Sequence, residues 1–263
     1  MILMRFKILL FLLIFSQLII LSSCRKDGPC INGDGDMVTE NRDVSGFTFI
    51  SFEGEGTVYV SQGSEYSLSI SAEQNILNDM ITEVIGDELR IFNDHCIHSH
   101  KSITVHITLP NPEGVSFSGS GDIVISSAIY TNNIELSLSG SGNISTMDSI
   151  VSDEVEVSIS GSGNIDVIAY THHLTTDIDG SGNCSLSGEA DEHTIDINGS
   201  GDLHSFDLLT DTTTIDINGS GDAEVFVNDF LDVDISGSGN VYYKGYPVIS
   251  IQVSGSGQLI NRN

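Results

Sequence analysis

Hydrophobic and polar residues alternate in short segments that recur along most of this chain. In Ile134–Leu138 and Val155–Ile159 every second residue is apolar, and the residues between them are polar. Because the side chains of a β-strand point alternately to its two faces, this period of two predicts strands with one buried face. The same alternation occurs in Leu231–Ile235 and Ile249–Val253. The chain is therefore expected to be built mainly from β-strands.

A Gly-Ser-Gly tripeptide follows these segments and divides the chain into similar units. It occurs eight times, with successive spacings of 18 to 21 residues, and its first glycines are Gly119, Gly140, Gly161, Gly180, Gly199, Gly219, Gly237 and Gly255. Four positions after each first glycine comes another residue that suits a buried position, such as Ile144 or Ile165. Each unit thus predicts a strand, a tight corner and a second short strand, and a period of this length indicates an array of equivalent units.

Two all-β architectures are compatible with this repeat. In a β-meander or propeller each unit would be a hairpin, whereas in a parallel β-helix each unit would be one coil. Propeller blades need about 40 residues or more, so units half that length favour the solenoid. Parallel crossover connections are almost always right-handed, and we therefore predict a right-handed parallel β-helix with Gly-Ser-Gly corners followed by Asn or Asp.

The corner residues suggest how each turn is made. Glycine adopts a positive φ cheaply, so we expect the corner glycines to have one. The next residue is Asn or Asp in seven units and Gln258 in the last. Asn and Asp side chains bond readily to local backbone, and stacked coils would align these groups in ladders.

Residues 38–113 lack the tripeptide but also have a β pattern. Phe52–Thr57 resembles a degenerate corner, and Ile81–Ile85 and Leu89–Phe92 would form a hairpin at Gly86-Asp87. Ala72–Met80 is long enough for one helical turn. We expect residues 38–113 to form the first coils and a cap, and residues 114–263 the repeated coils, in one domain spanning 38–263.

The N-terminus has the layout of a secretory signal peptide. Arg5 and Lys7 precede an apolar run over Ile8–Leu21, and small residues follow. Leu21-Ser22-Ser23-Cys24 resembles a bacterial lipobox, which would place cleavage after residue 23 and a lipid on Cys24. The alternative is an ordinary signal peptide with a chance cysteine. We expect residues 1–23 to be a lipoprotein signal peptide, residues 24–37 a lipidated tether, and the protein to be anchored to the outer membrane on either face.

The charge of the chain restricts its partners. Thirty-seven acidic and nine basic residues give a formal net charge of −28, and Ser102–Tyr243 contains no Lys or Arg. Nucleic-acid binding is excluded as a main function, because phosphate neutralisation requires basic residues. An anionic membrane surface would also repel the domain, so contact with the membrane is expected through the lipid.

Four aspartates occupy equivalent outward positions in consecutive units, three residues before the corner glycine: Asp177, Asp196, Asp216 and Asp234. Stacked at the spacing of β-strands, they would form a row of carboxylates able to bind Ca²⁺ through oxygen ligands. The alternative is an acidic, hydrated face that keeps a repetitive β protein soluble.

The remaining candidate chemistry lies in a histidine-rich segment and the cysteines. His95, His98 and His100, beside Cys96, could bind Zn²⁺ or Cu²⁺, although the segment also reads as a loop between strands. A Cys30–Cys96 disulfide is a possible alternative use of that cysteine. Cys184 falls in the inward row and is expected to be a buried thiol.

The opening Asn32–Phe47, together with the repeated Gly-Ser-Gly-Asn-Ile downstream, resembles the head GIN domain family of auto-transporter adhesins over about residues 38–262. The resemblance implies a pectate-lyase-like β-helix on secreted or lipid-anchored bacterial proteins, with cell adhesion as the function and no enzymatic site. It supports the predicted fold.

The sequence assigns no catalytic residues. Lyase chemistry would need a basic residue that the coils over 102–243 lack, whereas a hydrolase would need only paired carboxylates. Our prediction is a lipid-anchored, non-catalytic binding or adhesion module of the cell envelope, whose acidic faces contact a glycan or an envelope or surface protein. The alternatives are a periplasm-facing scaffold and, third, a carbohydrate-active enzyme.

Overall fold

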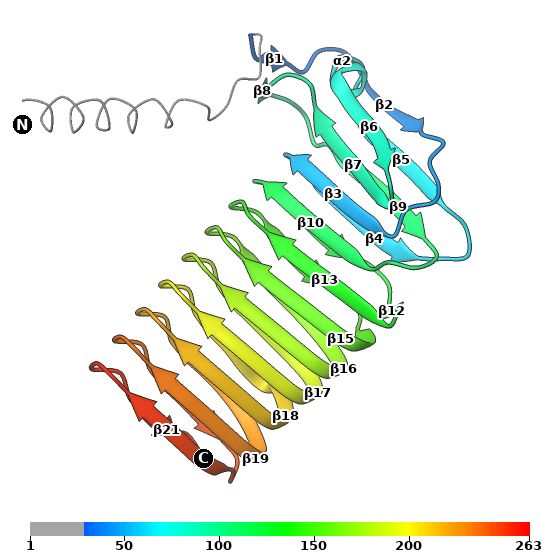
Figure 1. Cartoon of the computed structure of the whole chain (residues 1–263). Helices are drawn as coiled ribbons and strands as arrows, with labels where there is room; N and C mark the ends of the chain where they lie inside the picture. Colours follow the sequence, from blue (N-terminus) through cyan, green and yellow to red (C-terminus); the bar gives the residue numbers. More distant parts are fainter. Residues whose placement is uncertain (1–28) are drawn as a thin grey trace, which may run out of the picture.

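Strands one coil apart pair in parallel along the whole repeat region. The computed structural model describes residues 29–263, so the predicted signal peptide and Cys24 lie outside the described residues. Ile134 pairs with Val155, and Val155 pairs with Leu174 in the next coil. The strands stack one behind another in a β-solenoid of about seven turns (Figure 1). The predicted parallel β-helix is thus confirmed, and hairpin units are excluded for the repeats.

The body of the solenoid has thirteen strands, and the long ones run around a bend without interruption. They are β10 (Gly114–Gly119), β11 (Asp122–Ile125), β12 (Ile129–Tyr130), β13 (Asn133–Leu138), β14 (Asn143–Thr146), β15 (Ile150–Ile159), β16 (Asn164–Ile178), β17 (Cys184–Ile197), β18 (Leu203–Ile217), β19 (Ala223–Ile235), β20 (Val241–Lys244), β21 (Val248–Val253) and β22 (Leu259–Asn261).

Inward-facing residues form continuous apolar rows inside the coils. Ile144, Ile165 and Cys184 succeed one another in the row that follows the corners, and each is at most 1% exposed. Burial therefore confirms the predicted inward register and the buried position of Cys184. Burial also raises the pKa of the Cys184 thiol, which keeps it protonated and unreactive.

The corner glycines are required for a different reason from the one expected. Gly161 and Gly163 do not have positive φ, so that expectation is wrong for them. A Cβ on Gly161 would instead overlap the carbonyl oxygen of Gly140 in the preceding coil. That carbonyl accepts hydrogen bonds from the backbone N–H groups of Ser162 (3.0 Å) and Gly163 (3.2 Å). The corner sequence is thus dictated by close stacking of backbones between coils.

The N-terminal region continues the solenoid and then closes its end. Its elements are β1 (Ile31–Asn32), β2 (Met37–Asn41), β3 (Phe49–Gly54), β4 (Thr57–Gln62), β5 (Ser67–Glu73), α2 (Gln74–Asp79), β6 (Met80–Ile85), β7 (Glu88–Asn93), β8 (Ile97–Ser99) and β9 (Thr104–Leu109). β3 and β4 pair in parallel with β10 and β11, and Gly54 pairs with Gly119, so Phe52–Thr57 is a corner as predicted.

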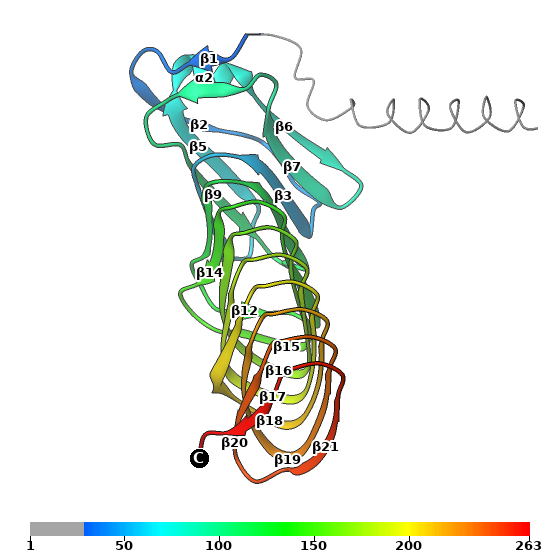
Figure 2. The ribbon, with the colours of Figure 1, turned by 90° about the vertical axis from the view of Figure 1, so that its left-hand side faces the viewer.

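Antiparallel strands and α2 cover this end of the stack (Figure 2). β6 and β7 form the predicted hairpin, β5 pairs antiparallel with β2 and β9, and α2 lies within the segment expected to hold a helical turn. β1 pairs with β8, so part of the expected tether lies against this cap. No helix among residues 29–263 is long and apolar enough to cross a bilayer.

The opposite end of the solenoid leaves its interior open among the described residues. The inward-facing residues Ile249, Ile251 and Val253 of β21 are 39%, 48% and 42% exposed, whereas their partners in β19 are buried. β20, β21 and β22 at this end contain no acidic residue, because the last one in the sequence is Asp234.

Candidate functional site

The four aspartates expected to form a row do lie in register along one wall. Asp177 pairs with Asp196, Asp196 with Asp216, and Asp216 with Asp234. Burial, with the nearby charge of Asp196 next in importance, raises the pKa of both Asp177 and Asp216 above its usual range. The row is therefore electrostatically strained when it is fully ionised.

Neighbouring amides relieve part of this strain. Asn218 Nδ2 donates to Asp216 Oδ1 at 2.8 Å, and Gln252 Nε2 donates to Asp234 Oδ2 at 3.0 Å. Asp234 Oδ1 is buried without a hydrogen-bond partner. Among residues 29–263, no three carboxylates of this row converge on one point, because consecutive members are one coil apart. Calcium binding by this row stays a prediction.

A second row of polar side chains lies at the corners. The Oδ1 of each Asn or Asp accepts a hydrogen bond from the next coil, as Asn183 Oδ1 does from the backbone N–H of Asp202 at 3.1 Å and Asp202 Oδ1 does from that of Asp222 at 2.8 Å. The predicted ladder of corner side chains is thus confirmed, but these side chains join successive coils instead of bonding to the backbone of their own corner as expected. This row has a structural role, since the Oδ1 of each residue is already engaged in joining two coils.

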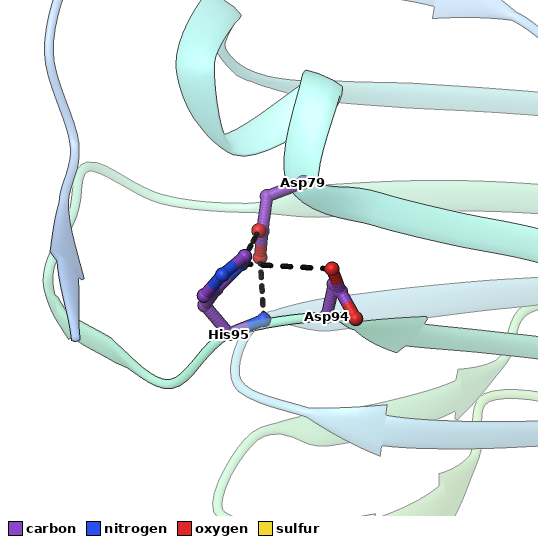
Figure 3. Close-up of side chains that lie close together, drawn as sticks. All are labelled: Asp79, Asp94 and His95. Carbon is purple, nitrogen blue, oxygen red and sulfur yellow. Dashed lines mark hydrogen bonds and ion pairs between the residues drawn. The ribbon is translucent and has the colours of Figure 1, made fainter. Parts of the chain in front are cut away.

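The three histidines considered as metal ligands have different partners. His95 Nδ1 lies 2.6 Å from Asp79 Oδ1 and 3.8 Å from Asp94 Oδ2 (Figure 3). His100 Nε2 lies 2.8 Å from Glu55 Oε2, and His98 belongs to no group of three ligand side chains among the described residues.

The group formed by Asp79, Asp94 and His95 has a structural explanation. Asp79 is the last residue of α2, and its Oδ2 accepts hydrogen bonds from the backbone N–H of His95 (3.2 Å) and from Asn93 Nδ2 (3.4 Å). Asp79 thereby fixes the chain where β7 ends, and the three side chains need no ion to account for their positions.

Cys30 and Cys96, which are 66 positions apart in sequence, form a disulfide with their Cα atoms 4.6 Å apart. It ties the segment before β1 to the loop before β8. Cys96 is therefore not a free thiolate for a metal in this structure.

A groove on the side of the solenoid was not identified in the sequence. It has a volume of about 600 Å³ and lies at the bend where β12 ends and where β15, β16 and β17 turn. Tyr130, Val151 and Tyr170 occupy equivalent positions in three consecutive coils and are 64%, 37% and 45% exposed. The sequence signal was their spacing of 21 and 19 residues, which matches the period of the corners.

Polar side chains surround this exposed row. Asn132, Asp153, Glu189 and Asp191 line the groove together with His172. His172 Nδ1 lies 2.6 Å from Asp191 Oδ2, and that hydrogen bond raises the pKa of His172 above its usual value. The arrangement offers an apolar strip, hydrogen-bonding groups and net negative charge, which are features of a binding surface.

Fold and surface together define a β-solenoid binding protein with long, regular side faces. A model of the family described as "Putative auto-transporter adhesin, head GIN domain" matches residues 46–164 and again residues 135–247. The chain belongs to this family, as the resemblance in its sequence predicted. Membership supports a non-catalytic binding role. No curated protein sequence matches the chain.

Solved structures of similar shape come from Parabacteroides. A putative lipid binding protein from Parabacteroides distasonis ATCC 8503 is 26% identical, with a TM-score of 0.85 over 89% of this chain and 100% of that one. A putative adhesin from the same strain is 22% identical, with a TM-score of 0.85 and the same coverage. A putative adhesin from Parabacteroides merdae ATCC 43184 is 19% identical, with a TM-score of 0.84 over 90% of this chain and 100% of that one. The last two similarities confirm the fold.

Proposed function

We propose that this protein is a lipid-anchored binding module of the bacterial cell envelope that contacts its partner along the side of the solenoid and acts in adhesion. Family membership carries the proposal. The exposed groove and the acidic row support a role in contact, because both are solvent-facing features of rigid β walls. A long wall supports adhesion, since equivalent groups repeated from coil to coil can contact an extended partner.

Lipidation of Cys24 is the anchoring part of the proposal. Fractionation of cells expressing the full chain tests it: Cys24→Ser should leave the membrane fraction and lose the acyl mass, while a Lys26→Gln control remains there. Membrane retention of the C24S protein would contradict the anchor.

Protease shaving of intact cells, with lysed cells as the control, tests adhesion. Digestion on intact cells is the expected result, because an adhesin must face outward. Digestion only after lysis would exclude adhesion and favour the second candidate, a periplasm-facing scaffold. Carbohydrate-active catalysis is a third candidate, and degradation of a polysaccharide panel by the purified protein would be needed to support it.

A further inference from the structure

The groove at the bend carries more apolar surface than the fold requires. Tyr130, Val151 and Tyr170 point away from the core rows, whereas the neighbouring inward residues Ile129, Ile150 and Ala169 are at most 1% exposed. A strip of exposed tyrosine and valine, in register over three coils, contrasts with the polar surface expected of a chain with a net charge of −28. Such an apolar strip indicates a contact site.

The floor and rim of the groove differ in hydrogen bonding. Ser152 Oγ donates to the Glu154 carbonyl, and Thr171 Oγ1 donates to the His173 carbonyl at 3.1 Å, so these floor hydroxyls are already satisfied. The side chains of Asn132 and Asp153 make no hydrogen bond within residues 29–263, although the Asn132 carbonyl accepts from the Asp153 N–H at 2.9 Å. The rim therefore offers to a ligand an amide and a carboxylate that have no other hydrogen-bond partner among these residues, on a backbone held by the Asp153–Asn132 hydrogen bond.

The chemistry of the strip and rim fits a sugar. One face of a pyranose ring carries C–H groups that pack against an aromatic ring, and its hydroxyls bond to planar amides and carboxylates. Three carboxylates, Asp153, Glu189 and Asp191, line the groove with a single histidine, so charge complementarity favours neutral or amino-substituted sugars over acidic ones.

The spacing of the strip distinguishes a sugar chain from an extended peptide. Successive coils lie about 4.8 Å apart, which is close to the length of one pyranose ring in an extended chain. An extended peptide repeats the direction of its side chains only every ~6.7 Å, which does not match the coil spacing. Tyr130 and Tyr170 are two coils apart, so they would meet alternate sugar rings.

We propose that this groove binds a neutral or amino-substituted pyranose oligosaccharide that runs along the solenoid axis, with rings stacked on Tyr130 and Tyr170 and with hydroxyl or amino groups bound by Asn132 and Asp153. The inference rests on the proposed binding function and names the class of its ligand.

Isothermal titration of the full chain, purified in detergent, tests this inference. The probes are cellohexaose, chitohexaose, a chitosan hexamer, a polygalacturonate oligomer and an oligolysine peptide. We expect a neutral or amino hexamer to bind, and Y130A/Y170A to weaken that binding at least tenfold, because both stacking platforms are removed. Tyr246→Ala is the matched control, since Tyr246 is 90% exposed and lies outside the groove.

Folding is checked by far-UV circular dichroism, and the double variant should melt close to the wild type because both tyrosines lie outside the buried core. Asn132→Ala and Asp153→Asn should each weaken binding. For Asp153→Asn, the loss of affinity should be larger for the chitosan hexamer than for the neutral hexamers. Absence of binding to every neutral or amino hexamer, affinity unchanged in Y130A/Y170A, or a preference for oligolysine or polygalacturonate would each overturn the inference.

The shaving experiment separates this inference from the proposed function. If the domain is digested on intact cells but no hexamer binds, adhesion stands and the sugar site fails. If a hexamer binds through the tyrosines but digestion requires lysis, the sugar site stands and adhesion fails.

Discussion

A histidine inside the solenoid should make the protein sensitive to mild acid. His193 is 1% exposed and sits in an inward row between Leu174 and Thr213. Its Nε2 is 2.9 Å from Thr176 Oγ1, its Nδ1 has no partner, and burial lowers its pKa from 6.5 to about 3. The folded protein therefore holds this imidazole neutral, whereas the unfolded chain protonates it below about pH 6.5.

The sign and size of the effect follow from this difference in proton binding. As pH falls below 6.5 the unfolded state takes up a proton that the folded state excludes, so the free energy of unfolding decreases until about pH 3. Between pH 6.5 and 4.5 the loss is about 2.3 kcal/mol. It is less than the full slope of about 1.36 kcal/mol per pH unit over this range, because the unfolded histidine is already half protonated at pH 6.5. Asp177 and Asp216 act in the opposite direction, because their raised pKa values make the folded state bind protons first.

A double variant isolates the histidine from these carboxylates. H193L/T176V replaces both hydrogen-bonding partners with apolar groups, which is expected to be nearly neutral at pH 7, whereas H193L alone leaves the Thr176 hydroxyl unpaired at a cost of about 1–3 kcal/mol. Urea unfolding followed by far-UV circular dichroism suits this chain, which has no tryptophan. The wild type should lose about 2.3 kcal/mol more than the double variant between pH 6.5 and 4.5. Equal pH dependence of the two proteins would refute the reasoning.

Three further predictions concern the corners, the aspartate row and the disulfide. Gly161→Ala should destabilise the coils by about 3 kcal/mol or more, because its Cβ would meet the Gly140 carbonyl. The control Ser162→Ala, at an exposed position, should change the melting temperature little. Equal melting temperatures for the two variants would contradict the stacking argument. Asp196→Asn removes one of the two central charges of the row and should stabilise the protein in EDTA by about 1 kcal/mol. If the row binds calcium, millimolar Ca²⁺ should raise the melting temperature of the wild type and not of the variant. No shift in either protein would end that hypothesis. C30S/C96S should speed hydrogen exchange in β1 and β8 and lower the free energy of unfolding by about 2–4 kcal/mol. Unchanged exchange in these two strands would show that their pairing persists without the crosslink.

Much of the fold could be predicted because the same residue types recur at the same positions of each coil. The inward rows through Ile144, Ile165 and Cys184 required only the period of two and the period of about 20. The corner at Phe52–Thr57 and the hairpin of β6 and β7 were also found, because glycines interrupt the apolar pattern there.

The candidate site was less accessible from the sequence. The aspartate row was found because its residues fall at one fixed offset from the corners. The groove was missed because Tyr130, Val151 and Tyr170 differ in residue type and lie at the bend, where the length of the units varies. The reason for the corner glycines was also misjudged, since a single chain segment does not show what the next coil places against it.

The sequence by itself determined the β class, the coil length and which residues face inward, because these depend on local alternation and on burial of apolar side chains. Only the tertiary structure decided which atoms meet between coils. Hydrogen bonding between coils fixes their spacing and brings residues about 20 positions apart into contact. This close spacing leaves room only for glycine at position 161, and it aligns Tyr130 with Tyr170 along the groove.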